Sequence, residues 1–260
     1  MNSLQNIKGL LIDIDDTITR HKAGVPMSGS SLFDVLQTAG VALGCLSAHE
    51  TARRIESVKN EVRWWHWSDF IVALELNPKQ FWDYAYNIES TYLEATGAEI
   101  LPALCRLQAH GMLLYIASNN PSSGILHKLR LAGIAHVNGS TLFSQLLGAT
   151  EMHAMKWEPN YWRKALAHIA LDASEVAVVG DNPHDDYAVP REVGIPVSFI
   201  LDRFCDRRGQ STESLIYVND FDEIADALLP EKHLHPLVNG KVSDPALQAK
   251  LVLNGATVPC

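Results

Sequence analysis

The chain has 260 residues and a formal net charge of -9 at pH 7. This length is typical of one large domain or of a core domain with a smaller companion, and an apolar fraction of 47% is enough for a sizeable core. The acidic balance argues against nucleic acid or an anionic membrane as a partner, because both require a basic face. No apolar run approaches the roughly 20 residues that cross a bilayer.

The cysteines favour a reduced, cytoplasmic protein. They are scattered along the chain without a close pair: Cys45, Cys105, Cys205 and Cys260. No basic start with a long apolar stretch precedes Leu10, so we expect no leader segment. The sequence leaves the oligomeric state open.

Short apolar runs with the length and branching of buried parallel strands alternate with helical patterns. This alternation predicts an α/β fold with a Rossmann-like, doubly wound parallel sheet, in which ligands bind beyond the carboxyl ends of the strands. The predicted strands are Leu10 to Ile14, Met112 to Ala117, Val176 to Val179 and Val197 to Leu201. The predicted helices are Ile100 to His110, Ser123 to Ala132, Tyr161 to Ile169 and Asp220 to Leu229.

The first predicted strand ends in a cluster of carboxylates, Asp13, Asp15 and Asp16, followed by the hydroxyl of Thr17. Carboxylates are costly to remove from water, so their crowding suggests a bound cation, a shared proton, or both. One carboxylate that remains ionised can attack as a nucleophile. Its neighbour, whose pKa the like charge raises, can act as an acid and then as a base. We interpret Asp16 as a turn residue.

The stretch from about Ala23 to Gly97 interrupts the alternation. It contains no convincing strand and predicts several consecutive helices inserted between the first two strands of the sheet. Ser47 with Glu50 is typical of a capping box. Asn77 followed by Pro78 is typical of a helix N-terminus. We therefore predict a helical domain at 23–97, a core domain at 1–22 and 98–229, and a tail at 230–260.

Two features of this insertion remain open. The aromatic residues between Val62 and Phe70, namely Trp64, Trp65 and Trp67 around His66, either form its core or face a substrate. The basic residues either lie on a solvated helix face or bind a substrate anion, and they are Arg53, Arg54, Lys59 and Arg63. In the tail, His233 and His235 are interpreted as exposed surface residues rather than metal ligands.

Polar residues also follow the second predicted strand. Ser118 comes first, and Asn119, Asn120 and Pro121 form a turn into a helix, with Asn120 as the expected N-cap and Pro121 at the first helical position. A hydroxyl beside free amide groups at a helix N-terminus can bind an anion. Ser118 can equally be a turn serine.

Further along the chain, Gly180 and Asp181 follow the third predicted strand. Asp181 would emerge beside Asp13, and two carboxylates of this kind suit Mg²⁺ with waters and a substrate phosphate. Lys156 lies in the loop before the helix that precedes the third predicted strand. There it can neutralise crowded anions or be a surface charge.

In this order, the elements from Ile7 to Leu229 resemble the haloacid dehalogenase superfamily, and the insertion resembles the cap domain of one of its branches. The matching residues are Asp13, Asp15 and Thr17 for the DxDxT motif, Ser118 for the second motif, Lys156 for the third, and Gly180, Asp181 and Asp186 for the fourth.

The resemblance implies a role for each position. Asp13 would be the nucleophile that forms an aspartyl phosphate, and Asp15 would protonate the leaving alcohol and later activate water. Residues that would bind the substrate phosphate are Thr17, Ser118, Asn119 and Lys156. Residues that would hold Mg²⁺ are Asp13, Asp15 through its backbone carbonyl, Asp181, and Asp186 or its neighbour Asp185, with Asp186 favoured.

The second aspartate decides the chemistry that the resemblance implies. Relatives that cleave carbon–halogen bonds lack it, so Asp15 favours a Mg²⁺-dependent phosphomonoester hydrolase for a small phosphorylated metabolite. A phosphomutase and a catalytically silent binding or scaffold protein are the alternatives. One departure concerns Lys156, because relatives commonly have proline after this lysine and Trp157 stands here.

Overall fold

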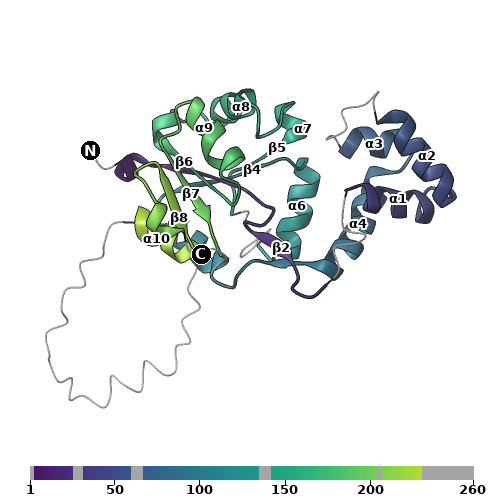
Figure 1. Cartoon of the computed structure of the whole chain (residues 1–260), viewed down its shortest axis with the longest axis horizontal. Helices are drawn as coiled ribbons and strands as arrows, with labels where there is room; N and C mark the ends of the chain where they lie inside the picture. The colour runs from purple at the N-terminus through teal and green to yellow at the C-terminus, as the bar shows by residue number, and fades with distance from the viewer. Residues whose placement is uncertain (1–2, 26–31, 60–66, 135–141, 204–206, 230–260) are drawn as a thin grey trace, which may run out of the picture.

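The computed structural model describes residues 3–25, 32–59, 67–134, 142–203 and 207–229. Their centre is a six-stranded parallel sheet with the order β5-β4-β1-β6-β7-β8 (Figure 1). The predicted doubly wound α/β class is therefore confirmed. The strands are β1 (Gly9–Ile12), β4 (Leu113–Ser118), β5 (Gln145–Gly148), β6 (Val176–Gly180), β7 (Val197–Leu201) and β8 (Leu215–Val218).

Each of the four predicted strands is present, with its ends shifted by at most two residues. Strands β5 and β8, which form the two edges of the sheet, are not among the predicted strands. Every residue of β1 is buried, as expected for a central parallel strand. The strand's alternation sends Leu10 and Ile12 to one face of the sheet and Leu11 to the other, so that each face has its own core.

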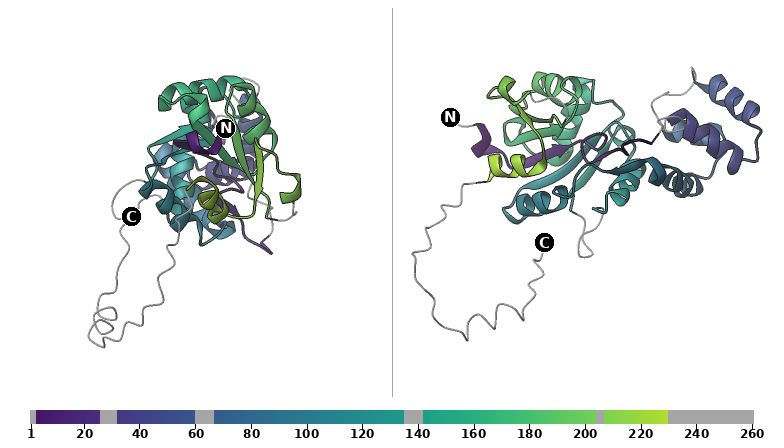
Figure 2. Two further views of the ribbon diagram at one scale, coloured as in Figure 1. Left: turned by 90° about the vertical axis from the view of Figure 1, so that its left-hand side faces the viewer. Right: turned by 60° about the horizontal axis from the view of Figure 1, so that its bottom comes forward.

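Helices cover both faces of the sheet (Figures 1 and 2). One layer contains α5 (Ile100–Ala109), α6 (Ser122–Leu131) and α10 (Phe221–Leu228). The other contains α7 (Ala149–Met152), α8 (Pro159–Ile169) and α9 (Val189–Glu192). Short helical turns are η1 (Ser3–Asn6), η2 (Ala173–Glu175), the π-helix η3 (His184–Ala188) and η4 (Arg208–Gln210).

Four helices between β1 and β4 form a helical insert with its own apolar core, which includes Leu36, Phe70 and Phe81. The insert protrudes from the sheet domain (Figure 2). A two-stranded antiparallel ribbon, β2 (Thr19–His21) with β3 (Leu93–Ala95), connects it to the sheet domain, so the stretch 23–97 does contain a short strand. The helices are α1 (Leu32–Ala42), α2 (Ala48–Val58), α3 (Trp67–Ala73) and α4 (Pro78–Tyr92).

The predicted helix starts in the insert are present. Asn77 accepts a hydrogen bond from the Gln80 amide, and Pro78 is the first residue of α4. Ser47 accepts from the Glu50 amide at 3.1 Å. The prediction of a full capping box is wrong, however, because the Glu50 carboxylate bonds to Arg53 and Arg54 of α2 instead of to the Ser47 amide.

Those two arginines, Arg53 and Arg54, form ion pairs along α2 with Glu50, and Lys59 pairs with Glu56. These contacts favour the solvated-face interpretation of the basic residues. Arg63 and the passage 62–66, with Trp64, Trp65 and His66, lie outside the described residues, as do the side chain of Trp67 and the tail with His233 and His235. In the parts of the chain that the structure describes, no helix is both long and apolar enough to cross a membrane.

Candidate active site

The end of β1 separates the two aspartates of the first motif. The Asp13 amide still donates to the Val179 carbonyl of β6 at 2.8 Å, which keeps its side chain buried at the carboxyl edge of the sheet. The chain then turns at Asp16, whose φ of 52° is left-handed. Asp16 is therefore the turn residue that the sequence predicts, and Asp15 lies at the exposed rim.

Lys156 lies between two buried carboxylates. Its Nζ is 2.6 Å from Asp13 Oδ1 and 2.5 Å from Asp186 Oδ1. The loop holds this lysine from both sides, since its amide donates to Asn119 Oδ1 at 2.8 Å and its carbonyl accepts from Trp162 Nε1 at 2.7 Å. Trp157 in place of proline therefore does not prevent the lysine from reaching Asp13.

Three carboxylates converge beside this lysine. Oxygen atoms of Asp13, Asp181 and Asp186 all lie within 4.8 Å of one another. Hard oxygen ligands in this number suit Mg²⁺, which takes a few carboxylates and completes its octahedron with water and phosphate oxygens. The residues present therefore fit the metal that the sequence predicts. Asp185 instead contacts His184 Nδ1, which favours Asp186 as the fourth-motif carboxylate.

Gly180 makes room for the Asp186 carboxylate. A Cβ at this position would lie 2.1 Å from Asp186 Cγ, well inside van der Waals contact. The π-helix η3 begins just after this turn and carries Asp186 back toward β6, where Oδ2 accepts from the Asn182 amide at 3.1 Å. Single π-helical turns are frequent at functional sites because they redirect one side chain.

The second motif is brought to the same edge of the sheet. Ser118 is the last residue of β4 and is buried, and its Oγ accepts from the backbone and side-chain nitrogens of Asn120. Thr17 Oγ1 lies 3.4 Å from Asp13 Oδ2. The expected N-cap is wrong, because α6 begins at Ser122 with Pro121 in the N-cap position and without a side-chain cap. The side-chain amide of Asn120 instead donates a hydrogen bond to Asp15 Oδ2.

Both carboxylate oxygens of Asp15 have a partner from the sheet domain. Asn120 Nδ2 donates to Oδ2 at 2.6 Å, and the ammonium of Lys128 forms an ion pair with Oδ1. Neither residue was predicted from the sequence as a partner of Asp15. Lys128 is a lysine within an amphipathic helical pattern, and only the tertiary structure shows that its ammonium reaches the first motif.

The electrostatics of the two aspartates differ from the expectation. Burial, with the charges of Asp186 and Asp15, raises the pKa of Asp13 to about 8 against the opposing charge of Lys156. Burial also raises the pKa of Asp15, but the charge and hydrogen bond of Lys128, the hydrogen bond of Asn120 and the charge of Lys156 together outweigh it, so the pKa of Asp15 is lowered. The prediction that the acid–base carboxylate has the raised pKa is therefore wrong for the metal-free protein, because the sequence did not reveal Lys128.

These side chains surround a small cavity of about 160 Å³ at the carboxyl edge of the sheet. Burial and the charges of Asp186 and Asp16 raise the pKa of Asp181 there to about 6. The cavity can hold a cation and one tetrahedral anion between carboxylates and Lys156. Its lining residues are Asp13, Asp15, Asp16, Asn119, Lys156, Asp181, Asn182, Asp185 and Asp186.

Solved structures with the same fold include proteins of different activity. A HAD phosphatase from Thermococcus onnurineus is 22% identical, with a TM-score of 0.57 over 85% of this chain and 98% of that one. An L-2-haloacid dehalogenase from Xanthobacter autotrophicus is 14% identical, with a TM-score of 0.50 over 85% and 97%. YfnB from Bacillus subtilis, solved with bound magnesium, is 15% identical, with a TM-score of 0.51 over 86% and 99%.

These identities establish the fold alone. No curated protein matches the chain significantly. The model of the haloacid dehalogenase-like hydrolases, in contrast, matches residues 7–194, which include every motif residue described above. With most of its length matched by this model, the chain belongs to the haloacid dehalogenase-like hydrolase family.

Proposed function

We propose that the protein is a Mg²⁺-dependent phosphomonoester hydrolase that acts on a small phosphorylated metabolite through an aspartyl phosphate on Asp13. The observation that carries this proposal is the position of Asp15, at the rim of the cavity that holds Asp13 and Lys156. A carboxylate there can exchange a proton with a leaving alcohol or with water. Family members that cleave carbon–halogen bonds lack this second aspartate.

In the first step, the Asp13 carboxylate attacks phosphorus and the bond from phosphorus to the leaving oxygen breaks. Asp15 gives its proton to that oxygen, so it must be protonated when the substrate is bound. In the second step, Asp15 takes a proton from water, the water oxygen attacks phosphorus, and the acyl phosphate bond breaks to release phosphate and Asp13.

The remaining residues hold the anions together. Lys156 offsets the charge on Asp13 and on the phosphoryl oxygens, and Ser118, Thr17 and Asn119 would orient those oxygens. Asp13, Asp181, Asp186 and the Asp15 carbonyl would hold Mg²⁺. When bound, the metal would neutralise the charge of the transferring phosphoryl group and keep Asp13 ionised.

We also propose that the helical insert is a cap that supplies substrate contacts. The described cavity is lined by residues of the sheet domain, and its small volume of about 160 Å³ fits little more than a phosphate and its cation. The rest of a substrate would therefore extend beyond the cavity, toward the insert. The substrate itself, and whether one or many are accepted, would depend on residues there.

The test measures phosphate release from sugar phosphates, nucleotides and phosphoglycolate, with Mg²⁺ or with chelator. Asp13→Asn should abolish release, and chelator should do the same to the wild type. Asp16→Asn is the matched control, because asparagine tolerates the left-handed turn and only a neighbouring charge is lost. Undiminished turnover by Asp13→Asn would contradict the mechanism.

Two other outcomes would change the assignment. Transfer of the phosphoryl group back to the same sugar, with slow attack by water, would identify a phosphomutase. No phosphate release from any substrate, with no phosphoenzyme analogue trapped by beryllium or aluminium fluoride, would favour a binding protein without turnover. Asp15→Ala should remain folded and bind metal, but it should lose about 100-fold or more in turnover.

A further inference from the structure

Lys128 is a buried lysine that no catalytic motif accounts for. It lies on α6, and its side chain is 11% exposed. The ammonium forms an ion pair with Asp15 Oδ1, while Asn120 Nδ2 donates to the other oxygen at 2.6 Å. The same Asn120 nitrogen donates to Ser118 Oγ at 3.0 Å. The Asp15 carboxylate is thus held between a helix and the end of β4, although the residue itself is exposed.

A residue of the helical insert contacts α6 directly beside Lys128. Glu89 on α4 is buried against α6, where it contacts His127 Nε2. His127 directly precedes Lys128 in the chain, so this contact anchors the turn of α6 that carries the lysine.

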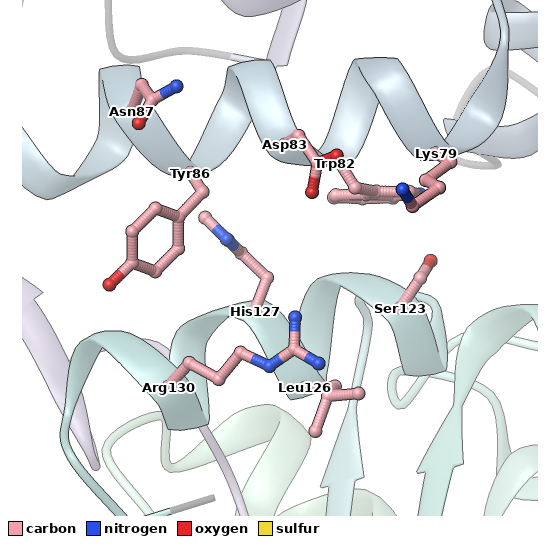
Figure 3. Close-up of a pocket in the computed structure, with 9 residues that line it drawn as sticks. All are labelled: Lys79, Trp82, Asp83, Tyr86, Asn87, Ser123, Leu126, His127 and Arg130. Atoms are coloured by element: carbon pink, nitrogen blue, oxygen red, sulfur yellow. The ribbon is translucent and has the colours of Figure 1, made fainter.

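The two helices pack closely at this point. Figure 3 shows His127 of α6 between the two helices, near Tyr86 of α4. Trp82 approaches so closely that a Cβ on Gly124 would lie 3.2 Å from its ring. The same contact residues, Trp82, Tyr86 and His127, also line a groove of about 730 Å³ between the two helices. The contact of Glu89 with His127 is thus part of the junction between α4 and α6.

We propose that Lys128 is a positioning residue for Asp15, and that the contact of Glu89 with His127, the residue before Lys128, couples docking of α4 on α6 to placement of the acid–base carboxylate. This inference rests on the proposed function, because it assigns Asp15 the acid–base role. An unheld carboxylate at an exposed rim would sample several rotamers, only some of which reach a leaving oxygen. The pairing to Lys128 and Asn120 removes that freedom from the ionised carboxylate, the form that takes a proton from water in the second step.

The kinetic experiment compares Lys128→Gln, Lys128→Arg and the control Arg130→Gln, which removes an exposed cation from the same helix. With an alkyl phosphate and Mg²⁺, Lys128→Gln should lower kcat about 10- to 100-fold, the range typical of residues that orient a functional group, with KM nearly unchanged. Lys128→Arg should recover part of this loss, and the control should match the wild type. An unchanged kcat for Lys128→Gln would overturn the proposal.

A double-mutant cycle separates positioning from a general structural role. In an Asp15→Asn background, Lys128→Gln should cause no further loss of kcat, because the group that it positions has lost its function. An equal loss in both backgrounds would show that Lys128 acts on something else. Glu89→Gln should lower kcat as well, whereas Asp83→Asn, which removes an exposed charge from the same helix, should not.

A thermal measurement without substrate distinguishes failure of this inference from failure of the proposed function. The lowering of Tm in the double variant Asp15→Asn with Lys128→Gln should be smaller than the sum of the two single changes, because both remove one ion pair. If the wild type hydrolyses no phosphomonoester, the proposed function fails, and this coupling still decides whether Lys128 holds Asp15. Additive Tm changes would refute the contact.

Discussion

The Lys156 ammonium lies 2.6 Å from Asp13 Oδ1, and both side chains are almost completely buried. Such a pair carries a large desolvation cost, which the contact of the same lysine with Asp186 and the hydrogen bonds of its loop help to offset. The pair therefore places the proposed nucleophile and its counter-charge in one rigid unit.

Lys156→Met should lower the free energy of unfolding by about 3 kcal/mol or more in the metal-free protein, because it leaves two buried carboxylates without their cation. Phosphate release should also be lost. Urea unfolding measures the first effect. Lys8→Met, which removes an exposed ion pair with Glu175, should cost less than about 1 kcal/mol as the matched control. Equal costs for the two variants would contradict the assigned burial of Lys156.

The stability of the metal-free protein should fall as the pH rises from about 4 to 8. The pKa of Asp181 is raised to about 6 and that of Asp13 to about 8, so in this window the folded state binds more protons than the unfolded state. Stability then decreases with pH until both groups are ionised in the folded state.

Urea unfolding in chelator across this pH range measures the slope. Saturating Mg²⁺ should reduce it, because the metal stabilises the ionised carboxylates. Asp181→Asn should reduce the slope below about pH 6 without metal. A stability that rises steadily from pH 4 to 8 in chelator would contradict the raised pKa values.

Gly180→Ala should weaken metal binding without removing any ligand. The new Cβ would lie 2.1 Å from Asp186 Cγ, so the carboxylate or the backbone must move. Overpacking of this kind typically costs 1–3 kcal/mol. Calorimetric titration with Mg²⁺ measures the affinity. Gly209→Ala, where a Cβ would meet no atom within 4 Å, serves as the control and should bind Mg²⁺ as the wild type does.

Arg53 and Arg54 should contribute little to substrate binding. Both pair with Glu50 along α2, where they lower its pKa to about 2. Replacing both by alanine should change the free energy of unfolding by less than about 1 kcal/mol, as is usual for exposed helical ion pairs. KM for the best substrate should stay within about twofold. A rise of KM by tenfold would restore the hypothesis that they bind a substrate anion.

Arg203 should stabilise the turn that follows Asp15. Its guanidinium donates to the carbonyls of Asp16 and Thr17 and to Thr96 Oγ1, with distances of 3.0 to 3.2 Å. Arg203→Met removes these three bonds, although the Thr17 carbonyl still accepts from Thr96 Oγ1 at 2.7 Å, and should cost about 1–3 kcal/mol. Hydrogen exchange should speed up at the amides of this turn. Arg191→Met, which removes an exposed bond to the Pro196 carbonyl, should have a smaller effect.

The central strands could be predicted because burial on both faces requires continuous apolar residues, and Leu10 to Ile12 and Val176 to Val179 provide them. Edge strands carry a weaker signal. In β5 only Leu146 and Leu147 are large and apolar. Strand β8 was predictable in principle, since Leu215 to Val218 is entirely apolar or aromatic and is followed by turn residues.

Site residues could be predicted where they come at or directly after the end of a strand, because parallel strands bring their carboxyl ends to one edge of the sheet. Asp13, Ser118 and Asp181 were found in this way. Lys128 and Asn120 could not be assigned, since their functions depend on which way a helix face and an amide point after packing. The choice of Asp186 over Asp185 follows from the fit between its carboxylate and Gly180, which spacing indicates only weakly.

The ribbon of β2 and β3 has one further consequence. The chain leaves the sheet domain and returns to it side by side, with Thr19 opposite Ala95, so that two distant points in the sequence form a single point of attachment. Deletion or replacement of the segment between β2 and β3 would leave the paths of β1 and β4 unchanged. The architecture therefore lets selection remodel the helical insert while the carboxyl edge of the sheet keeps its geometry.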